Sequence, residues 1–113
     1  MQRGILAVQT DPRTGEEGQF NAWYDQAHVP EILSTEGFIL GRRFRAVSTS
    51  GTPNGAGDWS KYLAIYDIAS ADIAASYQSL LERFRSGTMT AADHVSADPP
   101  YRAQLFEEIL RLP

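Results

Sequence analysis

Histidine is the side chain in this sequence best suited to acid–base chemistry near neutral pH, because only imidazole has an unperturbed pKa in that range. His28 follows Trp23 and Tyr24 at steps of five and four, which place all three on one face of a predicted helix. We expect His28 to act as a general acid or base in a pocket whose floor is formed by Trp23 and Tyr24. The alternative is a structural histidine that bonds to a free carbonyl group at the helix end.

Two further residues are candidates for contacts with a ligand. Arg43 stands between Arg42 and Arg45 and could clamp a carboxylate or phenolate, although an exposed strand edge or a salt bridge between subunits is the more common explanation for at least one of the three arginines. Tyr66 could reach the same pocket if its side chain points toward the helices. We therefore predict substrate-binding roles for Trp23, Tyr24, Arg43 and Tyr66.

Several kinds of chemistry lack their usual residues. The chain has no cysteine, which excludes disulfides, thiol nucleophiles and thiolate metal sites. His94 lies far from His28 in an irregular stretch, where we expect it to be exposed, and no spacing typical of a metal site links the two. No glycine-rich phosphate-binding motif is present either. We expect neither a metal nor a cofactor.

Length and charge restrict the class of protein. A chain of 113 residues with 42% hydrophobic residues predicts one globular domain, residues 1–113. Its formal net charge of −4 and the absence of a basic stripe argue against binding of nucleic acid or anionic membranes. No signal peptide or membrane span is recognisable, so we expect a cytoplasmic protein.

The first half of the chain predicts a strand, a helix and a second strand. Residues 5–8 form a short apolar run, and Thr14 with Glu17 has the spacing of a capping box at a helix start. Pro30 should push Val29 out of the helical region, with one further turn possible before Gly37. Residues 38–47 then alternate as a strand, with Phe38, Leu40 and Phe44 on one face.

The second half predicts a loop, two strands and a helix. Residues 48–58 are rich in glycine and should form the most mobile internal loop. Residues 62–68 are apolar enough on both faces for a central strand, and Ser70 can cap a helix that runs to Gly87. Residues 101–112 could be strand or helix, and we favour strand because the first strand otherwise lacks a partner.

The order β-α-β-β-α-β is typical of an α+β, ferredoxin-like fold, with four antiparallel strands and both helices on one face. The other face of the sheet would then expose an apolar patch too large for a stable monomer. We therefore expect a homodimer in which two sheets pack face to face as a dimeric α/β barrel.

Residues 19–31, QFNAWYDQAHVPE, closely resemble a recurring helix motif of the EthD-like dimeric α/β-barrel family, F-N-x-W-Y-x-x-x-H-V-P-E. The likeness continues in Gly37-Phe38 and Arg43-Phe44, although Phe44 replaces the tyrosine of the family's R-Y pair and lacks its hydroxyl. It spans the chain from the first strand to Tyr66. The resemblance implies the fold named above and leaves the reaction open, since the superfamily includes cofactor-free monooxygenases, isomerases, cyclases and haem enzymes. Because of the haem enzymes, haem ligation by His28 or His94 stays an alternative to a cofactor-free protein.

Together these features predict a protein with a pocket for a small apolar or aromatic molecule. We expect a cofactor-independent enzyme of aromatic or polyketide-type metabolism, such as an isomerase, lyase, cyclase or monooxygenase, with His28 as acid or base. The alternative is a dimer that binds a small ligand without turnover.

Overall fold

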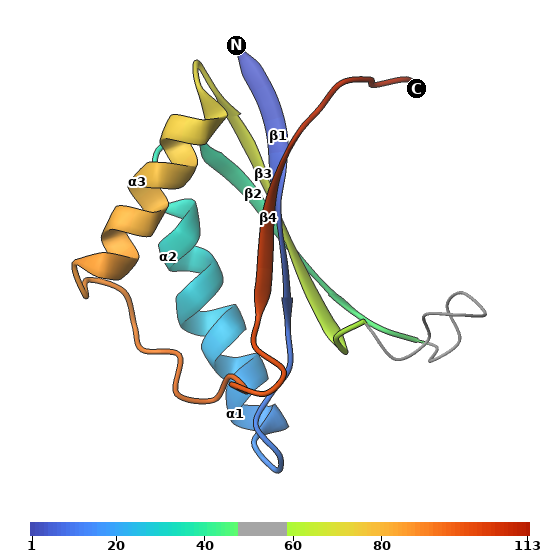
Figure 1. Cartoon of the computed structure of the whole chain (residues 1–113), viewed down its shortest axis with the longest axis vertical. Coiled ribbons are helices and arrows are strands. Elements are labelled where there is room, and N and C mark those ends of the chain that lie inside the picture. Colours follow the sequence, from blue (N-terminus) through green and yellow to red (C-terminus); the bar gives the residue numbers. More distant parts are fainter. Residues whose placement is uncertain (48–58) are drawn as a thin grey trace.

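A four-stranded antiparallel sheet carries all the helices on one face (Figure 1), as seen in a computed structural model that describes residues 1–47 and 59–113. The strands are β1 (Gln2–Thr10), β2 (Phe38–Arg45), β3 (Tyr62–Ser70) and β4 (Arg102–Glu107), in the spatial order β2-β3-β1-β4. The helices are α1 (Glu17–Trp23), the π-helical turn η1 (Tyr24–His28), α2 (Val29–Leu33) and α3 (Ile73–Arg85). This α+β arrangement has the predicted ferredoxin-like topology, and residues 101–112 supply the predicted fourth strand.

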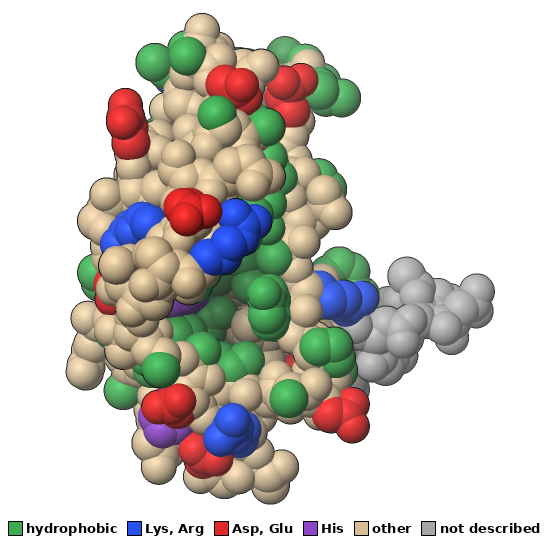
Figure 2. Space-filling model, turned by 60° about the vertical axis from the view of Figure 1, so that its left-hand side comes forward, with side chains coloured by type: hydrophobic (Ala, Val, Ile, Leu, Met, Phe, Trp, Pro, Cys, Tyr) green, Lys and Arg blue, Asp and Glu red, His purple; other side chains and the backbone are tan. Residues whose placement is uncertain are grey.

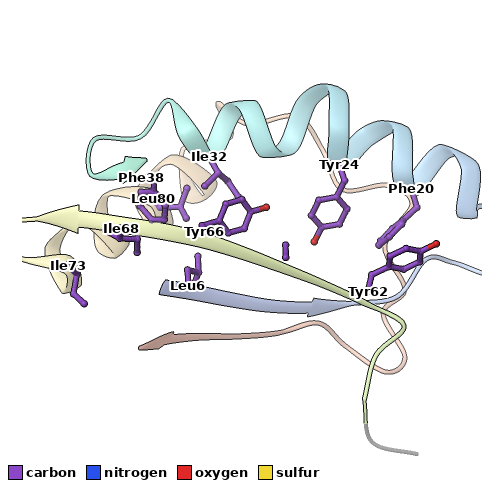
Figure 3. Close-up of a cluster of buried hydrophobic side chains, with 11 residues drawn as sticks. Leu6, Phe20, Tyr24, Ile32, Phe38, Tyr62, Tyr66, Ile68, Ile73 and Leu80 are labelled. Carbon is purple, nitrogen blue, oxygen red and sulfur yellow. The ribbon is translucent and has the colours of Figure 1, made fainter. Parts of the chain in front are cut away.

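The core fills the space between the helices and the inner face of the sheet (Figure 3). Alternate residues of β3 point inward, and Tyr62, Ala64, Tyr66 and Ile68 are all buried. Because the period of a strand is two, Leu63, Ile65 and Asp67 lie on the opposite, outer face. β3 is central, between β2 and β1, as its apolar residues on both faces predicted.

The prediction that Phe38, Leu40 and Phe44 share one face of β2 is wrong. A β-bulge between Phe38 and Leu40 shifts the register, so Phe38 pairs with Ile68 and is buried on the inner face. Leu40 and Phe44 lie on the outer face instead of sharing the face of Phe38. One inserted residue reverses the side on which every later side chain points.

The prediction that the first helix ends before Pro30 is wrong. Val29 has helical dihedral angles, φ −60° and ψ −49°, and the helical path continues through α2 with Pro30 in its first turn. A proline inside a helix removes one N–H donor and crowds the carbonyl group four residues earlier, here that of Gln26. The wider turn η1, in which the N–H of Val29 donates to the carbonyl of Tyr24, accommodates this conflict.

Two predicted helix caps are also wrong. The N-terminal cap of α1 is Glu16, and no side chain caps this end, so Thr14 and Glu17 do not form a capping box. Asp72, not Ser70, caps α3 by accepting a hydrogen bond from the N–H of Ala75. Ser70 is instead the last residue of β3 and accepts a hydrogen bond from the Ser76 hydroxyl.

The predicted mobile loop, residues 48–58, lies outside the described residues. Within the described part of the chain, no helix is long and apolar enough to cross a membrane.

Candidate functional site

A cavity of about 320 Å³ lies between the helices and the β1–β4 half of the sheet. Figure 2 shows a hollow on this side of the molecule with hydrophobic side chains inside and basic side chains at its edge. Side chains from every layer line the cavity: Leu6, Val8 and Thr10 of β1, Trp23, Tyr24, His28 and Ile32 of the first helical segment, Tyr77, Leu80, Leu81, Phe84 and Arg85 of α3, Ala92, Val95 and Tyr101 of the segment 86–101, and Ala103 of β4. A concave, mostly apolar site with few polar groups is typical of small-molecule binding.

Three of the predicted site residues, Trp23, Tyr24 and His28, line this cavity together. The rings of Trp23 and His28 are stacked, with centroids 4.2 Å apart and an angle of 20° between the planes. The ring of Tyr24 meets that of His28 edge to face at 5.2 Å. Residues five apart lie about 140° apart around an α-helix, so the stack of Trp23 on His28 depends on the wider turn η1.

The two ring nitrogens of His28 differ in their surroundings. Nδ1 is enclosed and has no hydrogen-bond partner, whereas Nε2 is not enclosed in this way and no other described residue bonds to the imidazole. The residue is only 8% exposed. Nε2 is therefore the nitrogen that can exchange a proton or a hydrogen bond with a molecule in the cavity.

Burial lowers the pKa of His28 to about 4. The carboxylate of Glu31 opposes this shift, and the nearby charge of Arg43 adds to it. The imidazole is thus neutral at pH 7. In the free protein it can accept a proton, but it holds none to donate as an imidazolium ion.

The two tyrosines differ in how their hydroxyl groups are placed. The Tyr24 hydroxyl lies 3.0 Å from the Thr10 hydroxyl in a buried hydrogen bond, whereas the Tyr66 hydroxyl is enclosed without a partner. Burial raises the pKa of both phenols, so both are protonated at neutral pH. Tyr66 points toward the helices, but it is not among the residues that line the cavity.

Arg43 lies behind Tyr24 and does not line the cavity. Its guanidinium carbon sits 4.4 Å from the centroid of the Tyr24 ring, and its Nη atoms donate to Asp25 at 2.8 Å and to Asn21 at 2.9 Å. The fork of donors that we expected to hold a ligand is engaged within the protein, where it fixes Tyr24 against β2. Arg42 points to the outer face and pairs with Asp67.

His94 belongs to the segment 86–101, which connects α3 to β4 and lies along the cavity. It is half-buried rather than exposed, and its Nδ1 lies 2.9 Å from a carboxylate oxygen of Glu16. Thr90 in the same segment donates its N–H and its hydroxyl to the carboxylate of Glu31, each at 3.0 Å. These contacts hold the segment against the first helix so that Val95 can form part of the wall.

Several residues of the cavity wall were not among the predicted site residues. Thr10 follows Leu6 and Val8 at the period of a strand, and Phe84 follows Leu80 at the period of a helix, so these two could have been found. A basic residue at a helix C-terminus such as Arg85 is commonplace, and its position at the cavity required the fold. Among the described residues, no group of three or more acidic or histidine side chains could hold a metal ion.

Comparison of the sequence with models of known families and with curated proteins gives no match. Three solved structures match the fold over nearly the whole chain. One is a proposed monooxygenase from Shewanella loihica, with a TM-score of 0.61 and 11% identity over 99% of both chains. The second is an ethyl tert-butyl ether D (EthD) family protein from Bacillus halodurans, with a TM-score of 0.59, 18% identity, and coverage of 96% of this chain and 100% of that one.

The third structure is an EthD-like protein from Ralstonia eutropha, with a TM-score of 0.56, 16% identity, and coverage of 99% of this chain and 97% of that one. The fold is that of the EthD-like proteins. The resemblance noted in the helix motif of residues 19–31 is therefore confirmed for the fold. A fold of this kind does not define a reaction, so function has to be argued from the cavity.

Proposed function

We propose that this EthD-like chain binds a small apolar or aromatic molecule in the cavity and acts on it as a cofactor-independent enzyme of aromatic or polyketide-type metabolism. The observation that carries the proposal is His28, which lines an apolar cavity while its ring stacks on Trp23. A single titratable imidazole that meets bound substrate in an apolar pocket is an arrangement suited to proton transfer.

The aromatic rings around His28 support a flat ligand. Trp23, Tyr24 and Phe84 all lie within 6 Å of the imidazole, measured between ring centroids. Aromatic side chains pack favourably against other rings, and the cavity volume of about 320 Å³ is at the lower end of the range for small-molecule sites. A compact ring compound therefore fits better than a long or strongly polar one.

The proton-transfer role is testable without knowledge of the natural substrate. 2-Tetralone is a compact aromatic ketone whose C1 hydrogens exchange with solvent when a base removes them, so its exchange in D2O can be followed by proton NMR. We expect the wild-type chain to accelerate this exchange and His28→Asn to reduce the acceleration by about 10²–10⁴-fold, with the fold retained by circular dichroism. Equal rates with the wild-type chain and His28→Asn would contradict a proton-transfer role.

The second candidate function is binding of a small ligand without turnover. The low pKa of His28, about 4, favours this alternative, because such an imidazole is a weak base at neutral pH. Tight binding of aromatic ketones with no His28-dependent exchange would support it.

We also propose that the chain is a homodimer whose two sheets pack through their outer faces. Apolar side chains from all four strands lie on this face: Ile5, Ala7, Leu40, Phe44, Leu63, Ile65 and Phe106. Leu40, Phe44 and Phe106 are each more than 40% exposed in the single chain. A second copy would bury this patch through a self-complementary interface.

A further inference from the structure

The wall of the cavity carries one charged side chain. Among the described residues that line it, only Arg85 is charged at neutral pH, since His28 is neutral there. The other polar groups of the lining residues are the indole N–H of Trp23 and the hydroxyls of Thr10, Tyr24, Tyr77 and Tyr101, of which those of Thr10 and Tyr24 bond to each other. A ligand enclosed by this wall therefore meets mostly apolar surface, a few neutral polar groups and one charged group, the guanidinium of Arg85.

Arg85 is the last residue of α3 and its side chain is 63% exposed, which places it at the rim of the cavity. Its only partner among the described residues is Glu82, through one contact of 3.2 Å between Nη1 and Oε2. An exposed pair of this kind contributes little to stability. A guanidinium group has five N–H donors, so several remain available to a ligand.

The carboxylate of Glu31 is engaged by Thr90. The Glu31 carboxylate accepts hydrogen bonds from the N–H and the hydroxyl of Thr90, which hold it toward the segment 86–101. Figure 2 shows basic side chains beside the apolar hollow, at its edge. The rim thus offers a guanidinium group with spare donors next to an apolar interior.

We propose that the ligand of this cavity is an apolar ring compound that carries an anionic group, such as a carboxylate, and that Arg85 binds this anion at the rim. The proposal rests on the proposed function, because it concerns the same cavity. Arginine can hold a carboxylate with two parallel hydrogen bonds, while the ring of the same ligand packs against the apolar wall.

An anionic ligand would also change the chemistry of His28. Phe84, the neighbour of Arg85 in α3, has its ring 5.8 Å from the imidazole. A negative charge bound in the cavity would favour the protonated imidazole and so oppose the effect of burial on the pKa of His28. A bound anion would in this way make His28 a stronger base.

Isothermal titration calorimetry with two probes of the same shape tests the proposal. 2-Naphthoate carries the anion, and 2-naphthamide replaces it by an uncharged amide. We expect the wild-type chain to bind 2-naphthoate at least about tenfold more tightly. Arg85→Gln should abolish this preference without changing the affinity for 2-naphthamide, and Arg85→Lys should retain part of it. Arg13→Gln, at an exposed position outside the cavity wall, is the matched control and should behave as wild type.

The outcomes separate this proposal from the proposed function. If 2-naphthamide binds as tightly as 2-naphthoate, or if the preference survives in Arg85→Gln, the anion site is disproved while the apolar pocket stands. If neither probe binds the wild-type chain, the proposed ring-binding cavity fails and the anion site fails with it. Circular dichroism spectra that match wild type show that each variant has folded.

Discussion

At the scale of single residues, His28 is accessible to a ligand at one nitrogen and isolated from solvent elsewhere. Trp23 covers one face of its ring, and its Nδ1 is enclosed without a partner. The charged form of the imidazole loses hydration on burial, and this cost outweighs the attraction of the Glu31 carboxylate, so the pKa is lowered. The same isolation makes the residue sensitive to any charge that a ligand brings into the cavity.

This lowered pKa predicts that stability depends on pH. The pKa of His28 is about 4 in the folded chain and 6.5 by default in the unfolded chain. Between these values the unfolded chain binds a proton that the folded chain does not, so acidification favours unfolding. We expect the free energy of unfolding, measured with urea, to fall by about 2 kcal/mol between pH 7 and pH 5 through this group. His28→Asn should lose that part of the decrease, and an identical pH dependence in both chains would contradict the buried neutral imidazole.

At the scale of elements, the turn η1 determines the geometry of the site. It carries Tyr24 and His28, and by adding width to the helix it allows Trp23 to stack on His28 five residues later. The same turn lets the helix continue past Pro30 into α2, which packs against β2. A change in this short segment therefore alters both the cavity and the contact between helix and sheet.

Gly41 allows α2 to lie close to β2, and this predicts the effect of adding one methyl group there. A Cβ atom at Gly41 would come within 2.7 Å of Val29 Cγ1 and 3.5 Å of Tyr66 Cδ1. Because the β-branched side chain of Val29 has few alternative rotamers, we expect Gly41→Ala to lower the free energy of unfolding by about 1–3 kcal/mol.

Gly18 is the matched control for Gly41. It lies in α1 with no atom within 4 Å of an added Cβ, so Gly18→Ala should raise the free energy of unfolding by about 0.5–1 kcal/mol through helix propensity. Urea unfolding of both variants measures the two effects. A Gly41→Ala chain as stable as wild type would show that α2 does not pack closely on β2.

The stack of Trp23 on His28 depends on the turn η1. The order of the elements, and the shared face of Tyr24 and His28 four residues apart, could be predicted from the sequence because both follow from periodic patterns. The bulge in β2 and the turn η1 could not, since each depends on contacts with other elements rather than on a local pattern. Whether Arg43 and Tyr66 line the cavity also depends on contacts between elements, and neither of them does. Arg43 is held by Asp25 and Asn21 of the first helix, which no strand pattern reveals.

At the scale of the whole molecule, the sheet separates two surfaces of different character. The inner face carries the core and the cavity, and the outer face carries exposed apolar side chains over which no helix of residues 1–47 or 59–113 lies (Figure 1). The chain after β4 adds further exposed apolar residues, Ile109, Leu110 and Leu112. Both features are expected of a chain that buries them against another copy of itself.

We expect sedimentation equilibrium at micromolar concentration to give the mass of a dimer. Ile65→Arg would place a charge at the centre of the outer face and should give a monomer with its fold retained. Gln78→Arg, at an exposed position on α3, adds the same charge on the helical side and should leave the dimer intact. A wild-type chain that sediments as a monomer would rule out the sheet-to-sheet dimer.

The central claim is that a small apolar ring compound binds beside His28. The most direct test is proton–carbon NMR of the two histidine rings during titration with uncharged 2-naphthamide, with His94→Asn used to assign the signals. We predict that the His28 ring signals shift to saturation, while those of His94, which bonds to Glu16 and lies outside the cavity wall, stay in place. Saturated binding that leaves the His28 signals unmoved would contradict the account.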